Sequence, residues 1–252
     1  MAKDNITNRL SIGSWITLGH PAIAEIMASA GFDWLAIDLE HSVITLREAE
    51  ELVRVIDLKG LAPFVRLSSN NPEQIKRVMD AGAQGVIVPM VTTRQAAIDA
   101  VAAVKYPPLG LRSFGLARAQ GYGPQFDQYV DWQVDGTVVV VQIEHIEAVE
   151  NLGSILSVPG VDAYFVGPYD LSGSLGIPGQ FDHPKFLSAM EEIKRVAESS
   201  GVSGGVHIVE PDIAQLEKCI KEGQKFIAYS IDVRMLDISC RKGLDAVSEL
   251  RS

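Results

Sequence analysis

Short apolar runs alternate with longer amphipathic stretches along almost the whole chain, and this alternation constrains the fold more than any other feature. The runs are rich in β-branched and aromatic residues, which predicts strands near 11–17, 34–39, 62–67, 85–90, 138–144, 162–167, 204–209 and 226–231. The stretches between them have helical periodicity, and several open on a capping residue or an early Pro, which predicts helices at 45–58, 71–81, 92–104, 146–157, 184–199 and 211–222.

Eight β–α units in 252 residues match an α/β fold of the TIM (β/α)8 barrel type. A doubly wound open sheet is the competing architecture, but it usually has fewer strands, and no glycine-rich dinucleotide motif follows the first strand. No linker or change of composition divides the chain, so we expect a single barrel domain over 1–252. One connection, at about 105–136, is much longer than usual, and such ordered connections tend to form lids, binding loops or subunit contacts.

Charge and composition exclude several classes of partner. The net charge of −10, from 22 Lys and Arg against 32 Asp and Glu, disfavours binding to nucleic acid or to an anionic membrane. The N-terminal MAKDNITNRL lacks the apolar core of a signal peptide, and no apolar run approaches the length of a membrane span. Cys219 and Cys240 show no metal-type spacing. We therefore expect a cytoplasmic protein that acts on small molecules without an organic cofactor.

Polar residues collect at the carboxyl ends of the predicted strands, which is where a TIM barrel places its active site. They are Asp38, Glu40, His41, Arg66, Gln142, Glu144, Asp170 and His207. Each has a structural interpretation as well: Asp170 as the N-cap of a helix starting at Leu171, Arg66 as an ion-pair partner, His207 as a satisfied core histidine, and Asp38 as an anchor for the loop of His41. Convergence of such residues from separate strands favours an active site over a costly polar core.

Glu144 and Asp170 follow adjacent strands and could chelate one hard divalent cation. Two carboxylates without Cys, completed by water and substrate oxygens, suit Mg²⁺, Mn²⁺ or Co²⁺. Arg66 would supply a fixed positive charge for an oxyanion. An anionic substrate would thus meet positive charge inside an acidic protein.

Six segments, taken together and in order, resemble the metal-dependent (class II) pyruvate aldolases of the HpcH/HpaI type, which include 4-hydroxy-2-oxoheptanedioate and 2-dehydro-3-deoxyglucarate aldolases. The segments are FDWLAIDLEHS (32–42), APFVRL (62–67), GVIVPMV (85–91), YPPLGLRSFG (106–115), VQIE (141–144) and VGPYDLSGSLG (166–176). The resemblance implies a TIM barrel that binds pyruvate through a divalent metal. It also implies a homo-oligomer, commonly a hexamer with exchanged C-terminal helices, so that 233–250 would pack on a neighbour.

The resemblance also assigns roles to individual residues. It places the metal on Glu144 and Asp170 and Arg66 beside the keto oxygen. His41, supported by Asp38, would take part in proton transfer, and Gln142 would lie near the substrate. Trp15 would line the pocket entrance, and the turn of Gly167, Pro168 and Tyr169 would border the substrate. Two positions depart from the family pattern, namely Leu39 where Gly is common and Tyr169 where Ala or Ser is common.

The chemistry requires a carbanion next to a carbonyl, which proteins stabilise with a Schiff-base lysine or a metal. No lysine is expected to end a strand, since Lys59 and Lys225 precede strands and the others fall in helices, loops or the tail. We therefore expect reversible cleavage of a 4-hydroxy-2-keto acid to pyruvate and an aldehyde through a metal-stabilised pyruvate enolate.

Related reactions remain as alternatives. A lyase acting on a citramalyl- or malyl-type thioester, or an oxaloacetate decarboxylase, would use the same site. Arg112 and Arg118 in the long connection are the nearest candidates for a coenzyme A phosphate, although contact with a substrate carboxylate or hydroxyl, or with another subunit, is the favoured role. A non-catalytic barrel that binds metal only for structure is a remote alternative.

Overall fold

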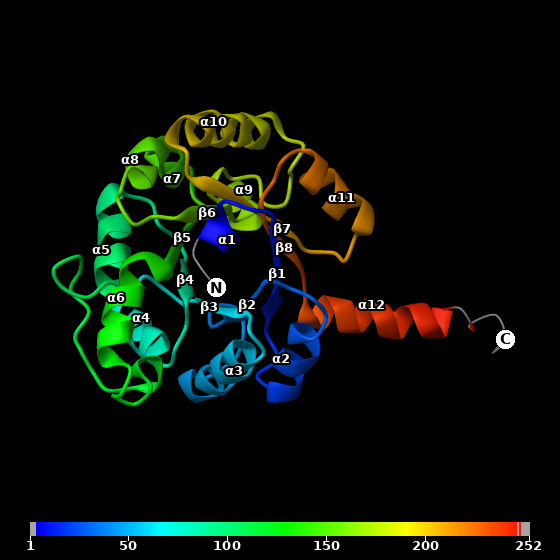
Figure 1. The fold of residues 1–252 in the computed structure, drawn as a ribbon. Coiled ribbons are helices and arrows are strands. Elements are labelled where there is room, and N and C mark those ends of the chain that lie inside the picture. Colours follow the sequence, from blue (N-terminus) through cyan, green and yellow to red (C-terminus); the bar gives the residue numbers. More distant parts are fainter. Residues whose placement is uncertain (1–3, 246, 248–252) are drawn as a thin grey trace.

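The computed structural model describes residues 4–245 and 247, and its strands close into a barrel of the expected TIM type (Figure 1). Each strand pairs in parallel with the next, and β1 pairs with β8. The strands are β1 (Ser11–Ile16), β2 (Trp34–Asp38), β3 (Ala62–Arg66), β4 (Gly85–Val88), β5 (Val138–Ile143), β6 (Ala163–Val166), β7 (Ser203–Ile208) and β8 (Phe226–Ile231). The predicted positions are confirmed to within one or two residues at each end.

Most helices surround the ring of strands, whereas the short α1 (Asp4–Thr7) lies inside the outline of the ring, with Ile6 in the interior core (Figure 1). The helices are α1 (Asp4–Thr7), α2 (Pro21–Ala28), α3 (Leu46–Leu58), α4 (Pro72–Asp80), α5 (Arg94–Val104), η1 (Arg118–Gln120), α6 (Phe126–Gly136), α7 (Ile146–Glu150), α8 (Leu152–Leu156), α9 (Pro168–Ser174), α10 (Pro184–Ser200), α11 (Ile213–Lys221) and α12 (Asp232–Asp245). Several begin where the cap residues indicate, as at Thr45, where a capping box with Glu48 opens α3. The single helix predicted over 146–157 is two short helices that meet at Asn151.

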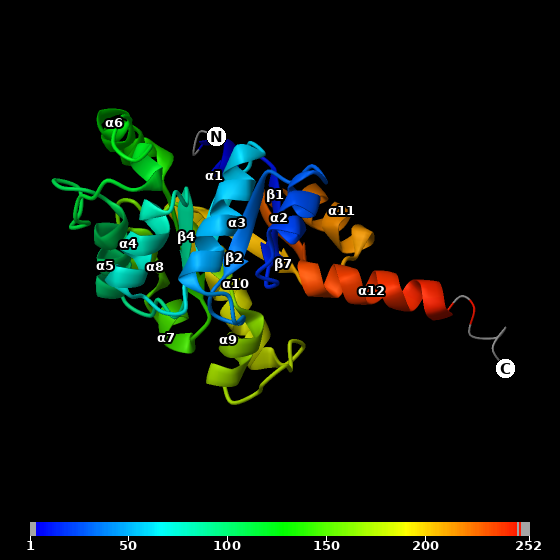
Figure 2. The same cartoon turned by 90° about the horizontal axis from the view of Figure 1, so that it is seen from below.

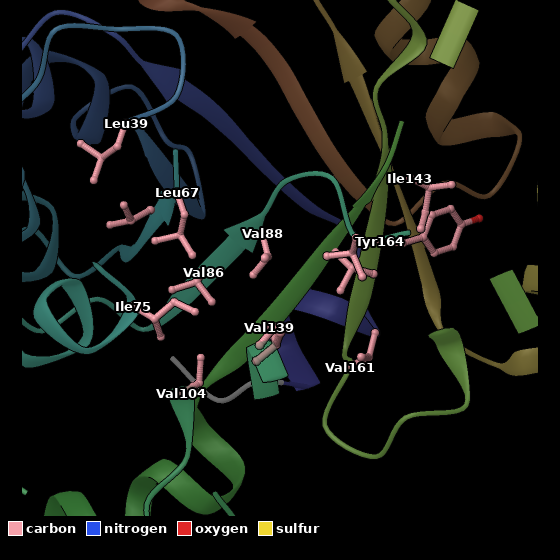
Figure 3. Close-up of a cluster of buried hydrophobic side chains, with 14 of the residues drawn as sticks. Leu39, Leu67, Ile75, Val86, Val88, Val104, Val139, Ile143, Val161 and Tyr164 are labelled. Atoms are coloured by element: carbon pink, nitrogen blue, oxygen red, sulfur yellow. The ribbon is translucent and has the colours of Figure 1, made fainter. Parts of the chain in front are cut away.

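Alternate residues of each strand face two different apolar cores. Val86 and Val88 point outward into the layer between strands and helices (Figure 3), whereas Ile87 between them points into the barrel. The barrel interior is filled largely by aromatic rings, and the ring centroids of Trp34 and Phe226 lie 4.9 Å apart. Glycine makes room for these rings, because a Cβ at Gly13 would lie only 2.0 Å from the Trp34 ring.

The long connection at 105–136 folds as a packed unit at the amino-terminal end of the barrel. It joins α5 to β5, so it belongs to the connections that lead into strands, and Figure 2 shows α6 on the side of the barrel opposite α9. Tyr106 and Tyr129 pack around the buried Arg112, which binds Asp80 at the end of α4. The insertion is therefore not a lid over this barrel's own mouth.

The last helix, α12, projects away from the barrel in both views (Figures 1 and 2). Leu236 and Leu244 on it are about half exposed. Of the segment 233–250 that the resemblance predicts to pack on a neighbour, 246 and 248–250 lie outside the described residues. Within the described part of the chain, no helix combines the length and apolar character needed to span a membrane.

Candidate active site

The mouth of the barrel, at the carboxyl ends of the strands, holds an arginine–aspartate pair. Asp38 ends β2 and Arg66 ends β3, and the two are register partners. Arg66 donates from Nε and Nη2 to the two carboxylate oxygens of Asp38, at 2.9 and 2.5 Å. Its guanidinium carbon lies 4.5 Å from the centre of the Trp15 ring, and 15% of the side chain remains exposed. Arg66 thus presents a fixed positive charge to the mouth.

Asp38 also anchors the loop that carries His41. Its Oδ1 accepts hydrogen bonds from the backbone N–H groups of Glu40 and His41, at 2.9 and 3.2 Å. Burial by itself would raise the pKa of Asp38, but the hydrogen bonds and charge of Arg66, with the two backbone donors, outweigh it and lower that pKa. The His41 side chain is 64% exposed, and its Nε2 lies 3.8 Å from a carboxylate oxygen of Glu40. Asp38 therefore supports His41 through the loop backbone and not through the imidazole.

Glu144 follows β5 directly and is buried among other acids. Its Oε1 accepts a hydrogen bond from the backbone N–H of Met90 at 2.7 Å, and its Oε2 accepts one from the side-chain amide of Gln142 at 3.1 Å. Burial raises the pKa of Glu144 to about 7, and the carboxylates of Glu40 and Asp170 act in the same direction. The negative charge of Glu144 is thus poorly compensated by the protein alone.

Asp170 lies in the first turn of α9, where it faces the Glu144 side of the mouth. The helix begins at Pro168 with Gly167 as its N-cap, so the interpretation of Asp170 as an N-cap before Leu171 is wrong. The carboxylate is exposed and caps no backbone N–H of the described chain. A Cβ at Gly167 would lie 2.6 Å from the Glu144 carboxylate, so glycine allows the turn to approach Glu144 closely.

A pocket of about 610 Å³ opens between these acids and α9. Its lining residues are Met90, Glu144, His145, Tyr169, Asp170, Gly173, Ser174, Pro178 and Gly179. Tyr169 is 64% exposed and packs edge-on against Phe181. Both expected carboxylates thus face one cavity, with Tyr169 at its border.

The comparisons with known proteins agree with this geometry. A sequence model described as HpcH/HpaI aldolase/citrate lyase matches residues 11–237. The chain belongs to this family.

A 4-hydroxy-2-oxo-heptane-1,7-dioate aldolase from Salmonella paratyphi C is 38% identical over 93% of this chain and 89% of its own length. A 2-keto-3-deoxy-L-rhamnonate aldolase from Klebsiella pneumoniae is 37% identical over 89% of this chain and 84% of its own. A crystal structure of a family protein from Burkholderia cenocepacia J2315 superposes with a TM-score of 0.88 at 34% identity, covering 97% and 96% of the two chains.

Membership of the HpcH/HpaI family confirms the resemblance, the barrel and the expectation of an aldolase-type lyase. The structure brings Asp38, Arg66, Gln142, Glu144 and Asp170 to one end of the barrel. Trp15 is only 3% exposed and lies beneath Arg66, so it belongs to the floor of the mouth rather than to an entrance.

The positions of Arg112 and Arg118 differ from the expectation that these arginines contact the substrate. Both lie at the opposite end of the barrel, where Arg112 is bound by Asp80 and Tyr129 and Arg118 by Asp57 and the carbonyl of Ala81. The connection that carries them leads from a helix into a strand, and such connections lie at the amino-terminal end. Neither arginine meets substrate at the mouth of its own chain.

Met90 is a site residue that the sequence does not reveal. The strand predicted over 85–90 and the segment 85–91 both include it without giving it a role. Its backbone has a φ of 53°, in the left-handed region, and this turns its N–H toward Glu144. Side-chain pattern carries no signal for such a conformation in a residue other than Gly, Asn or Asp. His145 and Pro178 also border the pocket without a preceding sequence signal, whereas Ser174 lies in the segment 166–176 that carries the resemblance.

The residues present fit a hard divalent cation. Among the described residues no group of three or more His, Cys, Asp or Glu side chains is arranged to hold a metal, so the pair of Glu144 and Asp170 is the candidate. Carboxylate oxygens completed by water and substrate oxygens suit Mg²⁺ or Mn²⁺. The raised pKa of Glu144 among neighbouring acids is the condition that a bound cation would relieve.

Proposed function

We propose that this protein is a divalent-metal-dependent aldolase that reversibly cleaves a 4-hydroxy-2-keto acid to pyruvate and an aldehyde. The observation that carries the proposal is the placement of buried Glu144 and exposed Asp170 on one cavity, in the same mouth as Arg66. The names of the two aldolase relatives support the same substrate class. Glu144 and Asp170 would hold Mg²⁺, Mn²⁺ or Co²⁺, which supplies Lewis-acid polarisation of the keto group.

Arg66 stabilises the charge that develops when the carbon–carbon bond breaks. In the cleavage direction the electron pair of the C3–C4 bond moves into the pyruvate half, which becomes an enolate with negative charge on the keto oxygen. Asp38 fixes the guanidinium by two hydrogen bonds, so Arg66 is oriented before the substrate arrives. Preorganised charge of this kind requires no rearrangement as the reaction proceeds.

His41 is the proposed proton carrier. Its exposed imidazole accepts the proton of the 4-hydroxyl group as the aldehyde forms, and it returns a proton to C3 of the enolate to give pyruvate. Gln142 orients Glu144 through the hydrogen bond from its amide. A Schiff-base route has no support in the described chain, where no lysine ends a barrel strand.

Exchange of the pyruvate methyl protons with D₂O, followed by NMR, tests the proposal without knowledge of the aldehyde. We expect exchange with Mg²⁺, Mn²⁺ or Co²⁺ that stops with EDTA and in Glu144→Ala. A matched control is Glu147→Ala, an exposed acid three positions on. No exchange with any of these metals would refute the proposal.

The thioester lyase is the weaker alternative for this chain. The two arginines considered for a coenzyme A phosphate are engaged by Asp80 and Asp57 at the far end of the barrel. Cleavage of a malyl- or citramalyl-type thioester by the protein, without pyruvate exchange, would favour it.

We also propose that the chain forms a homo-oligomer, as the hexamer of the resemblance implies. The projection of α12, with Leu236 and Leu244 about half exposed, supports assembly through this helix. Light scattering coupled to size exclusion should give a mass several times that of the chain, and a monomer at micromolar concentration would contradict this.

A further inference from the structure

One layer of side chains crosses the barrel where its interior changes from apolar to polar. Its members come from the alternate strands β1, β3, β5 and β7, as interior layers of a (β/α)8 barrel do. They are Trp15, Arg66, Gln142 and His207, and the residues two positions earlier, Gly13, Phe64, Val140 and Gly205, lie against the interior core. The rings of Trp15 and His207 lie 5.5 Å apart, and Arg66 covers Trp15.

Three of the four members carry a buried polar atom that lacks a hydrogen-bond partner in the described chain. These atoms are Trp15 Nε1, Gln142 Oε1 and His207 Nε2. Buried polar atoms in proteins are nearly always paired. Eight in the described chain are not, and because three of the eight lie together in this one layer, the layer is where a ligand would pair with them. Of the His207 ring nitrogens, Nε2 is thus without a partner in the described chain.

The hydrogen bonding of His207 defines what its free nitrogen can do. The ring hydrogen-bonds to the backbone of Ser230 in a way that favours its protonated form, so the imidazole is the donor. Because Nε2 is unpaired, this donor is Nδ1, and Nε2 of the neutral ring is left with a lone pair. Burial lowers the pKa of His207 to about 4, which keeps the ring neutral at physiological pH.

The chemistry of the substrate limits which group can donate to this nitrogen. The pyruvate half offers only acceptors, namely its carboxylate and keto oxygens, and these suit Arg66 and Trp15 Nε1. The 4-hydroxyl gives its proton to His41 in the proposed reaction. The remaining donor is a further hydroxyl on the aldehyde half, and Gln142 Oε1 adds a second unpaired acceptor in the same layer.

We propose that His207 is a specificity-determining residue whose Nε2 accepts a hydrogen bond from a hydroxyl of the aldehyde half, so that the enzyme favours hydroxyaldehydes. This inference rests on the proposed function and extends it to the class of the aldehyde. Asn at 207 would keep the donor to Ser230 and lose the acceptor. Gln at 207 would place an amide oxygen near the position of Nε2.

The test compares pyruvate addition to glycolaldehyde and to propanal, two aldehydes that differ by a hydroxyl in place of a methyl group. We expect wild type to prefer glycolaldehyde in kcat/KM, and the ratio of the two values to fall roughly tenfold in His207→Leu and His207→Asn. The loss should lie mainly in KM for glycolaldehyde, and His207→Gln should restore part of the preference. A ratio equal to that of wild type in both the Leu and Asn variants overturns the proposal.

A second measurement does not depend on catalysis. In ¹⁵N-labelled protein, long-range proton–nitrogen NMR should show His207 as the Nδ1–H tautomer with an unprotonated Nε2 at pH 7. Its Nε2 resonance should shift on addition of pyruvate and glycolaldehyde, and less with propanal. A protonated Nε2 in the free protein refutes the inference. Absence of pyruvate exchange in wild type instead refutes the proposed function, so the two failures are distinguishable.

Discussion

Two arginines at opposite ends of the barrel, the partly exposed Arg66 and the buried Arg112, make the same types of interaction and are expected to have different roles. Arg66 at the mouth is paired with Asp38 and lies 4.5 Å from the Trp15 ring centre. Arg112 at the amino-terminal end is paired with Asp80 and lies 4.6 Å from the Tyr106 ring centre. By type of interaction alone the two sites are indistinguishable.

The difference lies in what surrounds each pair. The Arg112 side chain is completely buried, Tyr129 takes a further hydrogen bond from it, and the insertion closes over it. Arg66 keeps an exposed edge, and Trp15, Gln142 and His207 beside it have unpaired polar atoms. Nε of Arg112 also lacks a hydrogen-bond partner in the described chain, so one unpaired atom does not separate the two sites. The exposed edge of Arg66 and the three unpaired atoms gathered in its layer do separate them, and they indicate a ligand site at the mouth.

The largest effect should come from Glu144→Gln at the mouth. It removes the buried charge proposed to hold the cation, and we expect turnover to fall by roughly 10³-fold, at the upper end of losses of a single charge-stabilising group. Steady-state cleavage assays with saturating Mn²⁺ give the measurement. Activity within tenfold of wild type would remove Glu144 from the proposed metal site.

Arg66→Ala should have the next largest effect. We expect roughly 10²- to 10³-fold slower turnover, since the variant loses the group that meets the developing charge. Asp38 keeps the backbone hydrogen bonds from Glu40 and His41, so the fold should survive. Kinetics with circular dichroism on the same sample provide the test, and wild-type-like turnover would make Arg66 a structural residue like Arg112.

Arg112→Ala should lower the stability of the protein and leave its turnover nearly unchanged, in contrast to Arg66→Ala. Its removal takes away the packing between Tyr106 and Tyr129 and the hydrogen bond to Asp80, and we expect about 2–3 kcal/mol lower free energy of unfolding. Turnover per folded molecule should stay within about twofold of wild type. Urea unfolding paired with kinetics checks both, and a large loss of turnover at normal stability would place Arg112 in an active site after all.

Features that depend on spacing along the chain can be predicted from the sequence, whereas contacts between distant residues cannot. The barrel follows from strand and helix periodicity, and the mouth residues follow from their places at strand ends, because both depend on spacing along the chain. The structural role of Arg112 does not follow from the sequence, because its partner Asp80 lies 32 positions away on α4 and no local pattern reveals that contact. The role of Met90 rests on a backbone angle, and the unpaired Nε2 of His207 is visible only in three dimensions, so neither follows from the sequence.

The lowered pKa of His207 at the mouth should give a smaller effect, on how the free energy of unfolding depends on pH. The pKa of His207 is about 4 in the folded protein and about 6.5 in the unfolded chain, so the unfolded chain binds more protons between these values. Stability from this group is therefore present above pH 6.5 and is lost as pH falls toward 4. Between pH 7 and pH 5 wild type should lose about 2 kcal/mol more than His207→Gln. Urea unfolding of both proteins at the two pH values measures this difference. An equal loss in free energy of unfolding for wild type and His207→Gln would contradict a neutral imidazole in the folded protein.

The smallest effect concerns the backbone at Met90, where the mouth holds a strained residue to orient an N–H toward Glu144. Glycine adopts a φ of 53° without a Cβ clash, whereas alanine retains the clash and loses the same side chain. We expect Met90→Gly to be more stable than Met90→Ala by about 1 kcal/mol, with the hydrogen bond to Glu144 available in both. Thermal unfolding of the pair measures this difference.

Tyr122 in the insertion has a φ of 59° but is not next to a proposed ligand, so Tyr122→Gly and Tyr122→Ala should differ in stability by a similar amount. The left-handed backbone of Met90 orients an N–H toward Glu144, and glycine at position 90 would hold this conformation less rigidly than alanine. We therefore expect Met90→Gly to bind Mn²⁺ more weakly than Met90→Ala. The two Tyr122 variants should bind Mn²⁺ equally well.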